Sequence, residues 1–156
     1  MTRKILVLGR SGQVARELEK LGAPEGHELV FAGRERFDLL SGADPRPLLD
    51  EVGPAAVINA AAYTAVDKAE SEPEAAFRLN RDAPAALAQA CAAARVPFVH
   101  FSTDYVFDGA KPEPYVETDP VNPTGVYGAS KAAGEERVLE AARRSMVFTK
   151  LAPKAL

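Results

Sequence analysis

The sequence predicts an α/β fold: a doubly wound parallel sheet between two layers of helices, in a three-layer α/β/α arrangement. Short apolar runs alternate along the chain with longer segments of helical character, which is the pattern of successive βαβ units. The apolar runs are nearly continuous and do not alternate with polar residues, as expected for strands that helices cover on both faces.

The expected strands are the apolar runs 4–8, 27–32, 55–60, 97–102 and 145–151. The expected helices are the segments 13–21, 73–95 and 127–144. In the first of these, Val14, Leu18 and Leu21 recur at helical spacing. We expect Pro84 to divide the second helical segment, because a proline starts a helix far better than it continues one.

The composition favours a single globular domain over residues 1–156, with 47% hydrophobic and 26% charged residues. The net charge of -3 and the lack of a long basic run argue against nucleic acid or an anionic membrane as partner. Cys91 is the only cysteine, which excludes a disulfide framework and favours a reducing, cytoplasmic setting. No apolar run approaches the length of a membrane span, and the sequence offers no support for a metal site.

A glycine-containing turn, with the sequence GRSGQVA over residues 9–15, separates the first strand from the first helix. Gly9 permits a tight turn, Gly12 lets the backbone approach a pyrophosphate, and Ala15 is small enough for close packing of the helix on the strand. Phosphates would lie at the helix N-terminus, although a plain strand–helix turn remains the alternative. The residues expected to contact a cofactor here are Gly9, Ser11, Gly12, Gln13 and Val14. This turn indicates a Rossmann-like NAD(P)-binding domain.

The end of the second strand bears on the choice between NADPH and NADH. No acidic residue stands directly at its tip to bind a ribose 2′-hydroxyl, whereas Arg34 suits a 2′-phosphate. Arg36 is a weaker candidate, and two solvated surface arginines are the alternative. Asp38 and Leu39 follow and are expected near the adenine. We therefore expect NADPH as the cofactor, with NADH possible.

Small side chains close the third strand and are expected to let a flat cofactor lie close to the backbone. The alternative is an ordinary packing site for buried alanines. The residues expected to contact the cofactor are Ala60, Ala61, Ala62 and Tyr63.

Tyr127 and Lys131 are four residues apart and project from one face if they begin a helix. A carbonyl reductase needs such a pair, because the alkoxide left by hydride transfer must receive a proton from a positioned acid. A nearby lysine cation lowers the pKa of a phenol, and Lys131 is also expected to hold the nicotinamide ribose. Thr103 follows the fourth strand, at the carboxyl edge where ligands bind in such sheets, and is expected to hydrogen-bond the substrate oxygen.

These motifs resemble those of the extended short-chain dehydrogenase/reductases and, within them, of the dTDP-4-dehydrorhamnose reductases. The resemblance covers roughly residues 3–145, and its most specific string is 103–109, TDYVFDG. The matching positions are 9–15, Asp38, Leu39, 59–64, 66–70, Asn80, 101–109, Pro123 and 127–131.

The resemblance implies NADPH-dependent reduction of dTDP-4-dehydro-L-rhamnose to dTDP-L-rhamnose. It implies a catalytic triad of Thr103, Tyr127 and Lys131, with Asp104 and Tyr105 near the sugar. It also allows a homodimer for the full-length protein. Two alternatives stay open: an NAD-dependent sugar-nucleotide epimerase or dehydratase, and a non-catalytic NADP-binding regulatory subunit.

The chain departs from the family pattern in two places. Ala15 stands where the family often has glycine, a change that packing tolerates. From about residue 146 the tail diverges: the family continues with an Arg-Thr-Ser-Trp type segment, whereas 148–153 reads FTKLAP. The substrate lobe is therefore expected to be missing or truncated, with cofactor binding retained and catalysis by this chain left open.

Overall fold

The computed structural model describes residues 1–141 and 145–148. In this part of the chain five strands form one sheet in the order β2-β1-β3-β4-β5. The strands are β1 (Arg3–Leu8), β2 (His27–Ala32), β3 (Ala56–Asn59), β4 (Phe98–Phe101) and β5 (Ser145–Phe148). All neighbouring strands pair in parallel, and Leu6 of β1 stands opposite Val30 of β2 and Val57 of β3. The predicted parallel sheet is confirmed.

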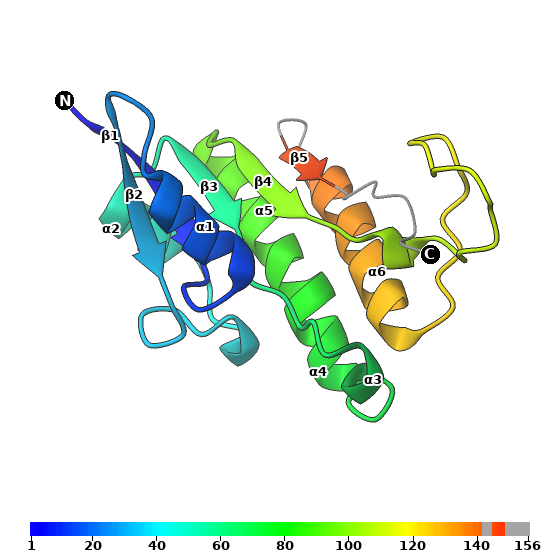
Figure 1. The fold of residues 1–156 in the computed structure, drawn as a ribbon. Helices are drawn as coiled ribbons and strands as arrows, with labels where there is room; N and C mark the ends of the chain where they lie inside the picture. The colour runs from blue at the N-terminus through cyan, green and yellow to red at the C-terminus, as the bar shows by residue number, and fades with distance from the viewer. Residues whose placement is uncertain (142–144, 149–156) are drawn as a thin grey trace.

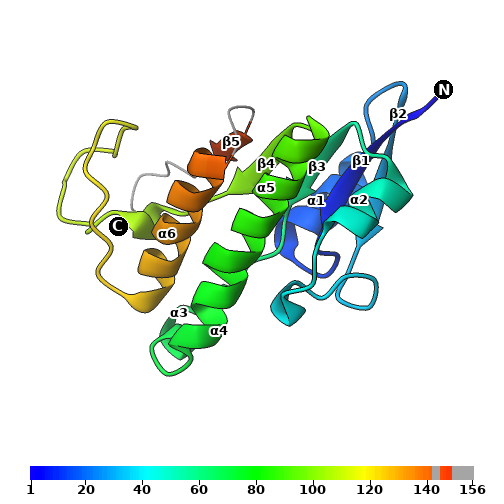
Figure 2. The same cartoon turned by 180° about the vertical axis from the view of Figure 1, so that it is seen from behind.

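Helices cover the sheet from both sides. Their bounds are α1 (Gln13–Leu21), η1 (Leu39–Ser41), α2 (Arg46–Val52), α3 (Val66–Ala69), α4 (Pro73–Phe77), η2 (Arg78–Asp82), α5 (Ala83–Ala94), η3 (Asp104–Val106) and α6 (Val126–Ala141). Figure 1 shows α1 in front of the strands, and Figure 2, from behind, shows α2, α5 and α6 over the opposite face. The three-layer α/β/α arrangement is therefore confirmed.

The local sequence signals placed most elements closely. α1 and β2 have the predicted bounds, whereas α2 and α3 are short helices that the periodicity did not reveal. The predicted residues 142–144 of the last helix and 149–151 of the last strand lie outside the described residues. No helix in the described part of the chain is long and apolar enough to cross a membrane.

Pro84 lies in the first turn of α5, as expected for a proline, but the chain does not break there. The preceding segment η2 is a π-helix, in which the Ala83 N–H donates to the Arg78 carbonyl. Asp82 keeps right-handed helical angles, with φ -73° and ψ -43°. The wider turn accommodates a residue that has no N–H to offer the Asn80 carbonyl four positions earlier. The helical path therefore continues from α4 through η2 into α5.

The main core lies between the sheet and the layer of α2, α5 and α6, and it includes Leu6, Val57, Leu87 and Phe98. Helix α6 approaches this layer very closely at a glycine. A Cβ added to Gly134 would overlap the Asn80 carbonyl oxygen, so α6 and η2 touch backbone to backbone. This close approach sets the position of α6 relative to the sheet.

Candidate functional site

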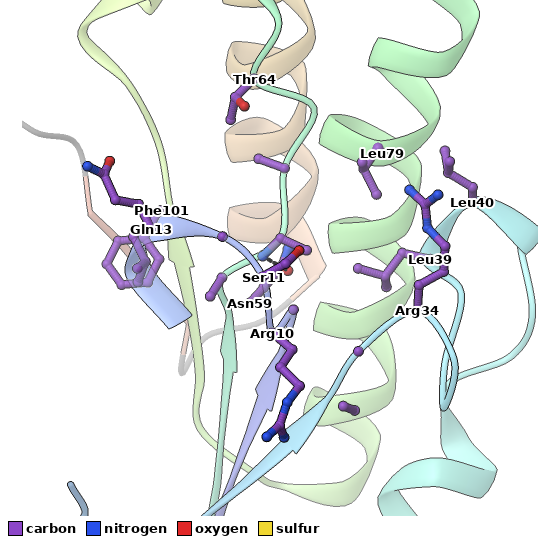
Figure 3. Close-up of a pocket in the computed structure, with 18 of the residues that line it drawn as sticks. Arg10, Ser11, Gln13, Arg34, Leu39, Leu40, Asn59, Thr64, Leu79 and Phe101 are labelled. Carbon is purple, nitrogen blue, oxygen red and sulfur yellow. Dashed lines mark hydrogen bonds between the residues drawn. The ribbon is translucent and has the colours of Figure 1, made fainter. Parts of the chain in front are cut away.

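A cavity of about 1150 Å³ lies at the carboxyl ends of the strands. It runs from the tip of β2, across the turn between β1 and α1, to the start of α6, and Figure 3 shows part of its wall. The sheet order reverses between β1 and β3, which is where open α/β sheets bind ligands. The predicted residues on its wall are Gly9, Ser11, Gly12, Gln13, Val14, Arg34, Asp38, Leu39, Ala60, Ala61, Ala62, Thr103, Asp104, Tyr127 and Lys131.

The turn after β1 leaves little room for side chains. Gly9 has φ +97°, and a Cβ there would lie 3.2 Å from the Ala61 backbone nitrogen. Gly12 is the N-cap residue of α1, and no side chain in the described part of the chain caps this helix. The first N–H groups of α1 and its dipole therefore favour an anion in the cavity.

Arg34 and Arg36 lie differently at the end of β2. Arg34 lines the cavity with a 74% exposed side chain, and its Nε lies 4.0 Å from Asp38 Oδ1. Arg36 instead pairs with Glu51 at 2.8 Å and does not line the cavity. Arg10, which the sequence analysis did not select, also lines the cavity, but its guanidinium points away from Arg34 (Figure 3), pairs with Glu19 at 3.4 Å and lies over the Phe31 ring.

An acidic side chain also stands at the tip of β2, contrary to the expectation from sequence. The N–H groups of Arg36 and Phe37 both donate to the Gly33 carbonyl, so the chain turns back after the strand. This turn folds the Glu35 carboxylate over Gly33, where a Cβ would overlap it, and Glu35 lines the cavity. The tip of β2 therefore presents both a cation and a carboxylate to any ribose bound there.

Tyr63 turns its side chain away from the alanine wall of the cavity. Its ring packs with Ala69, Ala76 and Tyr127, and its hydroxyl donates to Glu72 Oε2 at 2.6 Å. The hydrogen bond to Glu72 is the main cause that raises the pKa of Tyr63 to about 12. Thr64 and Leu79, which were not predicted, line the cavity instead (Figure 3).

Asn80 joins the alanine wall to the helix that carries Tyr127 and Lys131. Its Oδ1 accepts from the Tyr63 N–H at 2.8 Å, and its Nδ2 donates to the Tyr63 carbonyl at 3.0 Å. The same Nδ2 donates to Ser130 Oγ at 3.0 Å, and Ser130 Oγ donates to the Tyr127 carbonyl at 2.7 Å. One buried amide therefore holds both walls of the cavity in register.

Tyr127, Thr103 and Lys131 come together at the end of α6 that faces β4. All three are buried, and the Thr103 hydroxyl donates to Asp104 Oδ1 at 3.2 Å. The nearby Thr103 hydroxyl lowers the pKa of the Tyr127 phenol. Burial outweighs this effect, so the net pKa of Tyr127 is raised. Lys131 Nζ donates to the Phe101 carbonyl. Burial lowers the pKa of Lys131 itself to about 8, against the opposing charge of Glu135.

A buried pair lies beneath this group. Asn59 Oδ1 accepts from the Ala61 N–H, and Asn59 Nδ2 lies 3.2 Å from His100 Nδ1. Because an amide nitrogen only donates, Nδ1 accepts and Nε2 carries the proton of the neutral ring. Burial, with a smaller contribution from Lys131, lowers the pKa of His100 to about 3. The imidazole therefore stays uncharged and supports the wall through Asn59.

The start of α6 is held by a residue far away in sequence. Glu70 Oε1 accepts from the Val126 N–H at 2.7 Å, and a Cβ on Gly125 would lie 2.9 Å from the same oxygen. A carboxylate at a helix N-terminus satisfies a free N–H and interacts favourably with the dipole. This contact places Tyr127 in the first turn of a capped helix.

Together the glycine turn, the cavity at the strand ends and the buried Tyr127–Lys131 pair define a Rossmann-type α/β domain with the site arrangement of the short-chain dehydrogenase/reductase class. The chain belongs to the family whose model is described as the RmlD substrate binding domain, which matches residues 3–150.

Two similar curated proteins share a name. It is 47% identical over 138 residues to a dTDP-4-dehydrorhamnose reductase of Sinorhizobium fredii, covering 88% of this chain and 46% of that protein. It is 39% identical over 147 residues to the Escherichia coli dTDP-4-dehydrorhamnose reductase, covering 92% of this chain and 49% of that protein. The chain spans about half the length of the curated relatives it matches.

Two solved structures have folds similar to that of this chain. The dTDP-4-dehydrorhamnose reductase of Bacillus anthracis, in complex with NADP, superposes with a TM-score of 0.90 at 32% identity, over 96% of this chain and 53% of that one. The UDP-glucose 4-epimerase of Brucella ovis, in complex with NAD, has a TM-score of 0.77 at 20% identity, over 95% of this chain and 51% of that one. The second similarity concerns the fold alone.

Proposed function

We propose that the protein to which this chain belongs reduces the 4-keto group of dTDP-4-dehydro-L-rhamnose to dTDP-L-rhamnose with NADPH. In this proposal the chain supplies the cofactor site and the proton donor. The observation that carries it is one continuous cavity with the glycine turn at one end and Thr103, Tyr127 and Lys131 at the other. The shared name of the relatives supports the choice of substrate.

The residues present fit a dinucleotide. A side chain at position 9 would press on the Ala61 backbone, so the glycine there keeps a cradle open for a pyrophosphate. Arg34 would face a 2′-phosphate, and Asp38 and Leu39 would lie beside the adenine. The backbone of 60–63 and the side chain of Lys131 would hold the nicotinamide ribose. NADPH, when bound, supplies the hydride.

The chain's own residues supply the proton. Tyr127 donates its hydroxyl proton to the substrate oxygen. The Thr103 hydroxyl lies at the same end of the cavity and would hydrogen-bond the same oxygen. The Lys131 cation stabilises the phenolate that remains on Tyr127. Asp104 lines the cavity, whereas Tyr105 does not: its exposed ring meets the Tyr127 ring edge-on, with centroids 5.4 Å apart. Both would contact the sugar.

NADH remains a second possible hydride donor, and a specific observation favours it. The Glu35 carboxylate over Gly33 is placed to accept hydrogen bonds from ribose hydroxyls, as an acid at this position does in NAD-selective sites.

The single, buried cysteine fits our proposal of a cytoplasmic location.

Titration of this chain with NADPH, followed by fluorescence, tests the cofactor part. We expect saturable binding, weakened by about tenfold in Lys131→Met and unchanged in Lys68→Met, an exposed lysine on α3. In the full-length protein, Tyr127→Phe should lower kcat by about 10²- to 10³-fold with the keto-sugar nucleotide. If the wild-type chain shows no NADPH binding, or if Tyr127→Phe keeps full activity, the proposal is wrong.

A further inference from the structure

Three side chains on one face of α6 reach the end of β4, and the function proposed above uses only two of them. Tyr127, Lys131 and Glu135 are spaced four residues apart, so they lie above one another on the helix surface. Tyr127 meets Thr103, and Lys131 Nζ donates to the Phe101 carbonyl. Glu135 accepts a hydrogen bond from the Ser102 hydroxyl. Helix α6 therefore contacts three consecutive residues: Phe101 at the end of β4, and Ser102 and Thr103 directly after it.

Glu135 is an unusual residue for this place. It is only partly exposed, on a helix face that packs against the sheet, and its hydrogen bond to Ser102 keeps its carboxyl group beside β4. The charges of Glu135 and Lys131 interact: each favours the ionised form of the other. In the described part of the chain no direct ion pair joins the two groups: Lys131 Nζ donates to the Phe101 carbonyl at the end of β4, and Glu135 accepts from Ser102 directly after it. A half-buried carboxylate in this position acts on the lysine through its field.

We propose that Glu135 is a positioning residue for Lys131: held by Ser102, its carboxylate keeps the lysine charged and seated beside Tyr127. This inference rests on the proposed function, since a charged Lys131 matters for the phenolate and for the cofactor ribose. Glu135 itself lies one helical turn beyond Lys131 and does not line the cavity. Its effect on the reaction passes through Lys131.

The surroundings leave Glu135 as the main acidic partner of Lys131. Below Lys131, the buried imidazole of His100 is uncharged, because burial lowers its pKa to about 3. On η2, Arg81 and Asp82 pair with each other at 2.7 Å. The other titratable side chains on α6 are Tyr127, Glu136, Arg137 and Glu140. Those on the elements that pack against α6 are Asp67 and Lys68 on α3, Glu74 on α4, Arg78 on η2, Cys91 on α5, and Asp104 and Tyr105 on η3.

The test is an NMR titration of the Lys131 side-chain nitrogen in this chain, without any nucleotide. Its resonance is assigned by its loss in Lys131→Met. In Glu135→Gln, which keeps the shape and an oxygen for the Ser102 hydroxyl, we expect the measured pKa of Lys131 to fall by about one pH unit. Glu136→Gln, which removes an exposed carboxylate from the neighbouring position, should leave it unchanged. An unchanged Lys131 pKa in Glu135→Gln overturns the inference.

A second measurement needs no variant. In the wild-type chain, burial raises the pKa of Glu135 to about 7, so its ionisation should appear as an additional step near neutral pH in the Lys131 resonance. A Lys131 titration with a single step contradicts the coupling, even if Glu135→Gln does not fold.

Cofactor affinity then separates this inference from the proposed function. Glu135→Gln should weaken NADPH binding by about threefold at about pH 7.5 and hardly at about pH 6, where Lys131 is charged in both proteins. A merely structural role would weaken binding equally at both pH values, which would contradict the inference. If the wild-type chain binds no NADPH, the proposed function fails, while the nucleotide-free titration still decides the role of Glu135.

Discussion

Replacing Asn80 with alanine tests whether one buried amide holds the two walls of the cavity together. Asn80 is 1% exposed and makes three hydrogen bonds, two with the backbone of Tyr63 and one with Ser130 Oγ. A neutral intramolecular hydrogen bond contributes about 1 kcal/mol net, and an unpaired buried group costs somewhat more. Asn80→Ala should therefore lower the free energy of unfolding by about 3 kcal/mol.

Urea unfolding followed by circular dichroism measures this loss. Asn122→Ala is the matched control, because Asn122 is exposed and its side chain makes one hydrogen bond, to Asp108 Oδ2 at 3.2 Å. It should cost less than about 1 kcal/mol. Asn80→Asp keeps the acceptor for the Tyr63 N–H but loses both donated bonds and buries a carboxylate against the Tyr63 carbonyl, so its cost should be at least that of Asn80→Ala. Equal losses for Asn80→Ala and Asn122→Ala would refute the reasoning.

Three further changes follow from the structure. Gly134→Ala should destabilise the chain by about 2 kcal/mol or more in thermal unfolding, because its Cβ would overlap the Asn80 carbonyl oxygen. This cost exceeds the helix preference of alanine over glycine, which is about 1 kcal/mol, so a stabilised variant would contradict the reasoning. Arg34→Ala should weaken NADPH binding by about tenfold and NADH binding little, while Arg36→Ala changes neither; equal losses for both cofactors would count against a 2′-phosphate contact. Burial raises the pKa of Glu135 to about 7, so the stability that its protonated form contributes is full below the unfolded pKa and is lost as the pH rises through 7. The free energy of unfolding of the wild type, relative to that of Glu135→Gln, should therefore increase by about 1–2 kcal/mol from pH 7 to pH 5. A difference that does not change with pH would argue against a raised pKa.

The parts of the site predicted from the sequence are those that local chain geometry places. The turn at 9–15 needs only a strand, a helix and small residues between them, so its role in the cavity wall follows from seven adjacent positions. Tyr127 and Lys131 share a face because a helix brings residues four apart together. Thr103 lies at the correct edge because parallel strands end on the same side.

The parts that sequence reasoning missed depend on partners far along the chain. Asn80 and Ser130 are 50 residues apart, and Glu70 and Val126 are 56 apart. No periodicity connects such pairs, and a lone Asn or Glu in a helical segment reads as a solvated residue. Only the contacts between these segments and α6 show that both side chains hold this helix.

Tyr63 and Glu35 are side chains whose direction the sequence did not predict: Tyr63 was expected at the cavity and points away from it, whereas Glu35 was not expected there and lines it. Tyr63 follows the alanine wall in sequence, but its hydroxyl donates a hydrogen bond to Glu72 and its ring packs against Tyr127. Glu35 was passed over because it does not stand directly at the strand tip, yet the turn after β2 returns its carboxylate to Gly33. In both cases the direction of the side chain is set by a turn or a neighbour that the residue type does not specify.

The sequence by itself therefore determined the parallel α/β sheet, the glycine turn and the Tyr127–Lys131 pair, because short-range geometry and hydrophobic patterning specify them. The tertiary structure decided how these pieces are held. It showed the Asn80 bridge, the Glu70 cap and the docking of Lys131 and Glu135 on β4. It also showed that burial, and not Lys131, dominates the pKa of Tyr127. Hydrogen bonds and desolvation act through distances in space, and only the packed fold sets those distances.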